Sequence, residues 1–343
     1  MATATTAMHC LFIAICTISL LLMASFLLDR NQSMSPSSRS FRYPATAGQH
    51  EESKSDTSIT TELAEATSLL TPSTALELEH IMGQEQDRRK RTLAEECRRI
   101  NPSEPTGNYR YLHVNDKHKL LFHFIPKVSS TTWKTILSTL NNETGNVKPV
   151  LFNYKQDDAR LKSYRKVLFI REPMSRLLSA YLSKLRNRSR LQRIWERSYG
   201  SDISRRYRGV KNQTLKEGQW FDITFVEFSK YITDLGSGFI SNDITDHWLP
   251  QYKLSRPCHV KYDFIGHFEN LAVEGPFVLR WLGVDNIVHF PEYHSSNAKQ
   301  QFLKYYKSIS PDLMRKLIDY YHVDYRLFGY SPDDAMSQVL QGV

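Results

Sequence analysis

The sequence lacks the glycine-rich loops with which most enzymes bind nucleoside triphosphates. Its 343 residues contain no G-x-x-x-x-G-K-[ST] segment, no glycine-rich kinase loop, and no H-R-D or D-F-G motif. These absences exclude ordinary P-loop nucleoside triphosphatases and protein kinases, whose phosphate binding depends on those segments. No His/Cys cluster has the spacing of metal ligands, and we therefore expect no metal cofactor.

Zinc-finger spacings and RNP-like aromatic motifs are also missing, although the net charge is +9. A positive excess favours an acidic partner, and the missing motifs argue against nucleic acid as that partner. Cysteine is scarce. Of the four, Cys10 and Cys16 lie in an apolar run, which leaves Cys97 and Cys258 in the rest of the chain. These two either form a disulfide in an oxidising compartment or remain two buried thiols.

The longest uncharged stretch lies near the amino terminus, at residues 10–28. About nineteen apolar residues can span a bilayer, and a cleaved signal peptide usually has a shorter apolar region, so we predict an uncleaved anchor. A cleaved leader is the alternative. Arg30 follows the run and no basic residue precedes it, opposite to the charge bias of a type II protein. The predicted layout is a cytoplasmic tail (1–9), an anchor (10–28), a luminal stem (29–89), a catalytic domain (90–332) and a C-terminal tail (333–343).

Hydrophobic patterning in the catalytic domain predicts alternating strands and helices. Short β-branched and aromatic runs predict strands at 119–125, 166–171 and 262–267. Apolar residues at helical spacing predict helices at 130–140, 174–187, 224–232, 270–282 and 311–321. Residues 76–100 are expected to form a surface helix that introduces the domain. This alternation predicts an α/β domain with a central parallel sheet and helices on both faces.

The first strand-to-helix junction has the composition of an anion-binding site. The apolar run ends at Pro126-Lys127, and four hydroxyl residues begin the next helix: Ser129, Ser130, Thr131 and Thr132. Backbone N–H groups in the first turn of a helix have no intrahelical partner, and the helix dipole is positive there. The lysine and the hydroxyl groups complete a phosphate-binding site.

A second anion site follows the next predicted strand. Arg171 lies at the carboxyl end of that strand, where ligands bind in open α/β sheets. Pro173 suits the first position of the following helix, and Ser179 lies further along that helix. Two such sites suit a nucleotide that carries phosphates at both ends.

Pro126-Lys127-Val128 with Trp133-Lys134 resembles the 5′-phosphosulfate-binding motif of Golgi carbohydrate sulfotransferases, in the family of the HNK-1 and chondroitin/dermatan 4-O-sulfotransferases. Arg171-Glu172-Pro173, followed by Arg176-Leu177 and Ser179-Ala180, is similar to the 3′-phosphate-binding motif of that family. The family usually has Cys-Thr-Asn at Ser130-Thr131-Thr132 and aspartate at Glu172. Further similar motifs are His247-Trp248, Pro257-Cys258, Tyr262-Asp263-Phe264-Ile265-Gly266 and Leu327-Phe328-Gly329-Tyr330.

The resemblance implies a P-loop-like sulfotransferase fold and transfer of sulfonate from 3′-phosphoadenosine 5′-phosphosulfate (PAPS) to a glycan hydroxyl. The implied acceptor position is the 4-position of N-acetylgalactosamine in chondroitin or dermatan. HNK-1-type sulfation of the 3-position of terminal glucuronic acid is the alternative within the family. A non-catalytic glycosaminoglycan-binding membrane protein is the alternative from another class. The implied location is the Golgi membrane, as a single-pass type II protein with a luminal domain.

The resemblance also suggests roles for individual residues. Lys127 is expected to stabilise the oxygen that bridges sulfur and phosphorus. His247 is expected to be the base that deprotonates the acceptor, with a buried structural histidine as the alternative reading, and His123 and Glu172 are further candidates. The expected donor-binding residues are Pro126, Lys127, Val128, Ser129, Ser130, Thr131, Thr132, Trp133, Arg171, Glu172, Pro173 and Ser179.

Other features fit a luminal glycan-modifying enzyme. N-x-[ST] sequons occur at Asn31, Asn142, Asn187 and Asn212. The resemblance favours a disulfide between Cys97 and Cys258. A basic segment at 184–211 is either a solvated surface or a groove for an acidic glycan. The candidate acceptor-binding residues within it are Arg186, Arg188 and Arg190.

Overall fold

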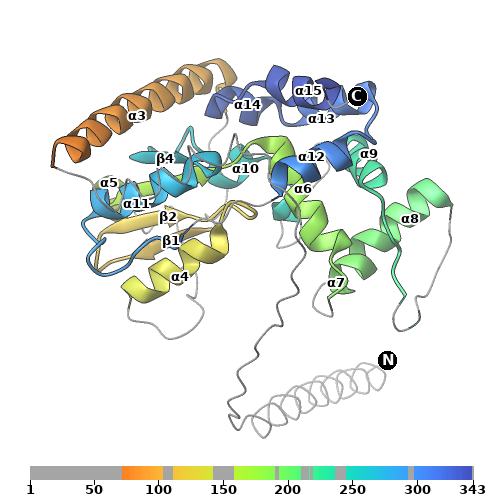
Figure 1. The fold of residues 1–343 in the computed structure, drawn as a ribbon, viewed down its shortest axis with the longest axis horizontal. Helices are drawn as coiled ribbons and strands as arrows, with labels where there is room; N and C mark the ends of the chain where they lie inside the picture. The colour runs from red at the N-terminus through yellow and green to blue at the C-terminus, as the bar shows by residue number, and fades with distance from the viewer. Residues whose placement is uncertain are drawn as a thin grey trace, which may run out of the picture. The chain divides into compact units, whose positions relative to one another are not determined.

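The computed structural model describes residues 72–102, 111–141, 158–189, 193–209, 216, 219–235, 245–292 and 297–341 (Figure 1). The predicted anchor at 10–28 lies outside these residues, and so do three sequons and one of the candidate acceptor residues: Asn31, Asn142, Asn212 and Arg190. Among the helices that the structure describes, none has the length and apolar character needed to cross a bilayer.

Four strands form the sheet, in the order β1-β2-β3-β4. They are β1 (Leu112–Asn115), β2 (Leu120–His123), β3 (Arg165–Ile170) and β4 (Phe264–His267). β2, β3 and β4 are mutually parallel, as predicted, but β1 pairs antiparallel with β2. The sheet is therefore mixed and not fully parallel. A four-residue turn joins β1 to β2, and a connection this short permits only antiparallel pairing.

Two helices cover the aromatic face of the sheet. Trp133 of α4 (Ser130–Leu140) packs with ring centroids 4.7 Å from Phe122 on β2 and 4.9 Å from Phe169 on β3. Phe277 of α11 (Leu271–Leu282) stacks on Phe264 of β4 at 6.0 Å. These contacts fix the start of α4 relative to the end of β2, which is where the first anion site is predicted.

A long amino-terminal helix, α3 (Pro72–Ile100), covers the free edge of β4 and runs beside α14 (His322–Phe328) (Figure 1). Gln86 accepts a hydrogen bond from Ile265 N at 2.8 Å and donates one to Ile265 O at 3.0 Å. Arg89 forms a buried ion pair with Glu274 at 2.7 Å. Because these contacts belong to the domain, the stem boundary drawn at residue 89 falls inside an integral helix.

A second core lies among α6 (Pro173–Tyr181), α9 (Phe225–Leu235), α12 (Ala298–Tyr306) and α13 (Pro311–Tyr320). α15 (Pro332–Gln341) occupies most of the segment expected to be a C-terminal tail, and its Ala335 is buried. The remaining short elements are α5 (Asp158–Ser163), η1 (Leu182–Arg186), α7 (Arg193–Trp195), η3 (Glu196–Gly200), α8 (Ser201–Arg208), η5 (Thr245–His247), α10 (Gln251–Ser255) and η6 (Phe268–Asn270).

Cys97 and Cys258 are joined by a disulfide, the first of the two alternatives that the sequence left open. The bond connects the end of α3 to the segment after α10, across a sequence separation of 161 residues. Closing so long a loop removes much conformational freedom from the unfolded chain, which stabilises the fold.

Candidate active site

The loop between β2 and α4 adopts a conformation suited to binding an anion. Lys127 has φ 72° and Ser129 has φ 50°, both in the left-handed region that non-glycine residues rarely occupy. Val128 N donates to Ile125 O at 3.1 Å, which closes a tight turn. Strained backbone of this kind costs on the order of 1–3 kcal/mol per residue and concentrates at functional sites, where alternating conformations aim N–H groups at one point.

The N-terminus of α4 has no side-chain cap. Ser129 is the N-cap residue, and its hydroxyl accepts no capping hydrogen bond. The first intrahelical bond runs from Trp133 N to Ser129 O at 3.1 Å, so the N–H groups of Ser130, Thr131 and Thr132 precede the helical ladder. These donors, with the positive end of the helix dipole, can bind a phosphate group.

Lys127 is half-buried at this loop, and no described residue forms an ion pair with its ammonium group. Burial, together with the nearby charges of Lys184, Arg171 and Arg176, lowers its pKa to about 8. A cation that is partly desolvated beside other cations is stabilised when an anionic ligand binds. The structure therefore places Lys127 where a phosphate-bearing donor can be held.

Arg171 lies beside the Lys127 loop, as the parallel pairing of β2 and β3 requires. Its Nη1 donates to Lys127 O at 3.2 Å. Its guanidinium lies over the ring of Phe268, with Cζ 4.2 Å from the centroid. Gln251 fixes the backbone, accepting from Arg171 N at 2.9 Å and donating to Arg171 O at 2.7 Å. The two predicted anion sites thus adjoin each other, and sequence reasoning missed the support from Phe268 and Gln251.

Glu172 has a structural role as the cap of α6, and its proposed roles in donor binding and as a base stay predictions. Its carboxylate caps α6, accepting from Met174 N at 2.9 Å and Ser175 N at 2.6 Å. It also accepts from Tyr325 Oη at 2.8 Å. Three donors therefore fix the position of this carboxylate at the start of α6. Pro173 occupies the first turn of α6, as its sequence position predicted.

Three other members of the proposed donor-binding set are buried. Pro126 and Val128 lie beneath the loop, and Trp133 is only 1% exposed within the aromatic core. Their side chains shape the loop from below and do not line its accessible side. Ser179 is half-buried on α6, and its contact with a 3′-phosphate stays a prediction.

Arg176 connects the two parts of the site, a function that sequence reasoning missed. This fully buried side chain donates from Nε to Pro126 O at 3.0 Å, from Nη1 to Leu249 O at 2.7 Å and from Nη2 to Asp246 O at 2.8 Å. It thereby ties the residue before Lys127 to the residues on both sides of His247. The sequence marked Arg176 only as part of a motif, because its partners are 50 to 73 residues away.

His247 lies on η5 with its ring edge against Trp195, the centroids 4.9 Å apart. Its Nδ1 is buried and has no hydrogen-bond partner among the described residues. Burial lowers its pKa to about 2, and the charges of Lys184, Lys127 and Arg176 act in the same direction. The imidazole is therefore neutral at pH 7, the form that accepts a proton, and a bound anion would raise its pKa by offsetting those charges.

His123, the second histidine considered as a base, lies in the core instead. Its side chain is 1% exposed, and its Nδ1 is 2.7 Å from Tyr262 Oη. Burial lowers its pKa to about 3. A side chain enclosed in this way cannot contact an acceptor sugar, so its candidacy is wrong.

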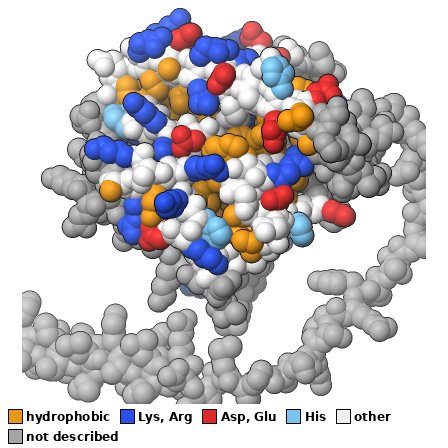
Figure 2. All heavy atoms as spheres, turned by 90° about the vertical axis from the view of Figure 1, so that its left-hand side faces the viewer, with side chains coloured by type: hydrophobic (Ala, Val, Ile, Leu, Met, Phe, Trp, Pro, Cys, Tyr) orange, Lys and Arg blue, Asp and Glu red, His pale blue; other side chains and the backbone are white. Residues whose placement is uncertain are grey.

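Many charges of the basic segment are paired with carboxylates from outside that segment. Arg186 lies 3.8 Å from Asp222, which also pairs with Arg188. Arg208 pairs with Glu227 at 2.5 Å. On another side of the molecule, the one that is on the left in Figure 1, Lys and Arg side chains are also interspersed with Asp and Glu (Figure 2). The segment is consequently less available to a polyanion than its composition suggested, although Arg186 and Arg188 remain exposed.

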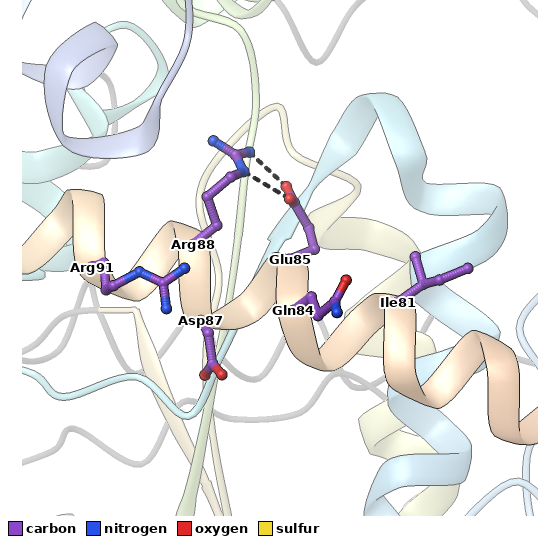
Figure 3. A pocket seen from close by; sticks show the side chains of 6 residues that line it. All are labelled: Ile81, Gln84, Glu85, Asp87, Arg88 and Arg91. Carbon is purple, nitrogen blue, oxygen red and sulfur yellow. Dashed lines mark hydrogen bonds and ion pairs between the residues drawn. The ribbon is translucent and has the colours of Figure 1, made fainter.

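A separate surface cavity lies along α3 and contains none of the motif residues (Figure 3). All its lining side chains come from this single helix, and Arg88 turns back to bond Glu85 at 2.7 Å. The lining residues are Ile81, Gln84, Glu85, Asp87, Arg88 and Arg91. We assign no ligand to it.

The chemistry therefore gathers at the carboxyl ends of β2 and β3, where uncapped N–H groups, two cations and a neutral imidazole meet. A mixed α/β sheet with adjoining anion sites at neighbouring strand ends defines a group-transfer enzyme that uses an anionic, phosphorylated donor.

Comparison with known proteins supplies the family. Residues 110–331 match the sulfotransferase family, and the chain belongs to it. It is 32% identical to carbohydrate sulfotransferase 14 of Danio rerio over 271 residues, 71% of each chain. It is 31% identical to carbohydrate sulfotransferases 11 and 10 of Rattus norvegicus, each over 66% of this chain and 68% of the relative. No solved structure gives a significant match. The family resemblance read from the motifs is thereby confirmed, and the protein is a sulfotransferase enzyme.

Proposed function

We propose that this enzyme transfers a sulfonate group from PAPS to a hydroxyl group of a glycan. The observation that carries this proposal is the 3.2 Å contact between Arg171 Nη1 and Lys127 O, which makes one continuous site of two anion-binding loops. The names of the relatives, all carbohydrate sulfotransferases, support a glycan as the acceptor.

The residues present fit the donor. The uncapped N-terminus of α4 suits the 5′-phosphate, and Lys127 stands beside it without a carboxylate partner among the described residues. Arg171, one strand away, suits the 3′-phosphate, with Ser179 as its proposed helper. Arginine binds phosphate through paired N–H groups, which gives both affinity and orientation.

When bound, PAPS supplies an activated sulfonate group and leaves as adenosine 3′,5′-bisphosphate (PAP). Lys127 Nζ stabilises the negative charge that develops on the bridging oxygen, an electrostatic contribution of about 3–4 kcal/mol for a well-placed donor. His247 accepts the proton of the acceptor hydroxyl, for which its neutral form is suited. Arg176 holds Lys127 and His247 in a common frame through its three carbonyl contacts.

For the acceptor we propose the 4-position of N-acetylgalactosamine in chondroitin or dermatan, with the 3-position of terminal glucuronic acid as the competing choice. Arg186 and Arg188 are the proposed contacts to the acidic chain, because both are exposed near Lys184 in sequence. We further propose that residues 10–28 anchor the enzyme in the Golgi membrane with its domain in the lumen.

Radiolabelled sulfonate transfer to a panel of desulfated glycans, followed by disaccharide analysis, tests this function. We expect label on the 4-position of N-acetylgalactosamine. Lys127→Met should abolish transfer, and Lys230→Met, an exposed lysine on α9, should leave it unchanged. If the wild-type protein transfers no label to any glycan and PAP does not raise its melting temperature, a non-catalytic glycan-binding protein becomes the better reading.

A further inference from the structure

A second lysine, Lys184, packs against the same tryptophan ring as His247. It belongs to η1, a π-helical turn (Leu182–Arg186) that directly follows α6. Its Nζ lies 4.0 Å from the ring centroid of Trp195. The same Trp195 ring contacts the imidazole of His247 at 4.9 Å. One aromatic ring therefore positions both the ammonium group and the proposed base, and π-helical turns of this kind are frequent at functional sites.

The ammonium group of Lys184 differs from its basic neighbours in having no carboxylate partner among the described residues. Arg186 and Arg188 share Asp222, and Arg208 has Glu227. Lys184 is half-buried, and its ammonium group lies over the face of Trp195. A cation–π contact compensates only part of the cost of removing an ammonium group from water. An anionic ligand would therefore stabilise the charged form of Lys184.

The charge of Lys184 acts on both proposed catalytic groups. Among neighbouring charges it is the largest influence lowering the pKa of Lys127, and also the largest lowering that of His247. Together with the Trp195 ring that Lys184 and His247 share, this indicates that Lys184 borders the space between the two groups. In the proposed reaction that space contains the sulfonate, because Lys127 binds the phosphate side and His247 binds the acceptor side.

We propose that Lys184 is a second catalytic lysine, which binds the sulfonate oxygens of the donor during transfer. The inference rests on the proposed function. The acceptor oxygen bonds to sulfur as the bond from sulfur to the bridging oxygen breaks, and the electron pair stays on the 5′-phosphate of PAP. The acceptor proton passes to His247, and Lys184 keeps its proton throughout.

PAP and PAPS differ only in the sulfonate, so comparing them isolates the contact. The experiment uses the full-length protein in detergent, with calorimetric titration of PAP and of PAPS without acceptor, followed by transfer kinetics. Lys184→Met should bind PAP within twofold of wild type but PAPS about tenfold more weakly. Its kcat should fall about a hundredfold while the acceptor KM stays within threefold. Lys184→Arg, which retains the charge, should recover part of both losses, and Lys230→Met should lose nothing.

The outcomes separate the inference from its premise. If wild type binds neither PAP nor PAPS, the proposed function fails. If wild type binds both and Lys184→Met weakens them equally, or raises only the acceptor KM, the sulfonate role is refuted and the donor assignment stands. If Lys184→Met does not fold, Lys184→Arg is measured in its place. Full activity together with an unchanged ratio of PAP to PAPS affinity would refute a specific contact of Lys184 with the sulfonate oxygens. A changed ratio would support that contact.

Discussion

Replacing Arg176 tests whether one buried guanidinium holds the active site together. Arg176→Met keeps the approximate length of the side chain and removes all three hydrogen bonds, to the carbonyl oxygens of Pro126, Leu249 and Asp246. Both the Lys127 loop and the His247 turn lose their common support. We therefore expect a loss of stability together with a loss of activity in the molecules that still fold.

The magnitude follows from two opposing contributions. Each hydrogen bond from a charged donor contributes about 1.5–3 kcal/mol. Burying the guanidinium costs several kcal/mol, which the methionine recovers. The difference is a net destabilisation of about 3–5 kcal/mol, the range found when one partner of a buried charged group is removed. In a domain of this size that lowers Tm by roughly 6–20 °C.

Thermal unfolding of wild type, Arg176→Met and Arg315→Met measures this effect. Arg315 is the matched control, because its guanidinium is exposed and pairs only with Asp312 three residues earlier. Exposed pairs of this kind contribute little, so its Tm should match wild type. PAP should raise the Tm of Arg176→Met less than that of wild type. A Tm for Arg176→Met within 2 °C of wild type would refute the reasoning.

Three further predictions follow from the same contacts. His247→Ala should keep PAP binding by calorimetry and lose transfer in the radiolabel assay; near-normal turnover would reject it as the base. Cys97→Ser should lower the free energy of unfolding by about 2–5 kcal/mol in denaturant titrations, and no change would show that the disulfide does not constrain the unfolded chain. Four buried histidines have pKa values that burial lowers to between about 2 and 4. Below pH 6.5 the unfolded chain therefore binds more protons than the folded chain, and the free energy of unfolding falls as the pH decreases. Thermal unfolding at pH 7.5 and pH 5.5 should show that the free energy of unfolding falls by on the order of 1 kcal/mol per histidine. A Tm that is higher at pH 5.5 than at pH 7.5 would contradict this. These histidines are His113, His123, His247 and His267.

The three parallel strands were predictable because each is a continuous apolar run buried on both faces. β1 was not, because its four residues include His113 and Asn115, polar side chains that become buried only through tertiary contacts. α4 and α11 followed from their helical apolar spacing. The helix at 76–100 was expected, but its contacts with β4 were not, because β4 lies far away in the sequence.

The adjacency of Lys127 and Arg171 was predictable for a similar reason. Lys127 and Arg171 each follow a parallel strand, and parallel neighbours end at the same edge of a sheet. Arg176 and Lys184 were not assigned roles, because their roles depend on partners that the fold alone brings near. For the same reason the sequence did not show that Arg186 and Arg188 pair with Asp222, which lies outside the basic segment.

Calorimetric titration of PAP into the full-length protein tests most directly whether Lys127 and Arg171 bind a single doubly phosphorylated nucleotide. Wild type should bind one PAP per chain. Lys127→Met and Arg171→Met should each weaken binding at least tenfold, and Arg315→Met should not. No heat with wild type, or a loss confined to one of the two variants, would contradict the account.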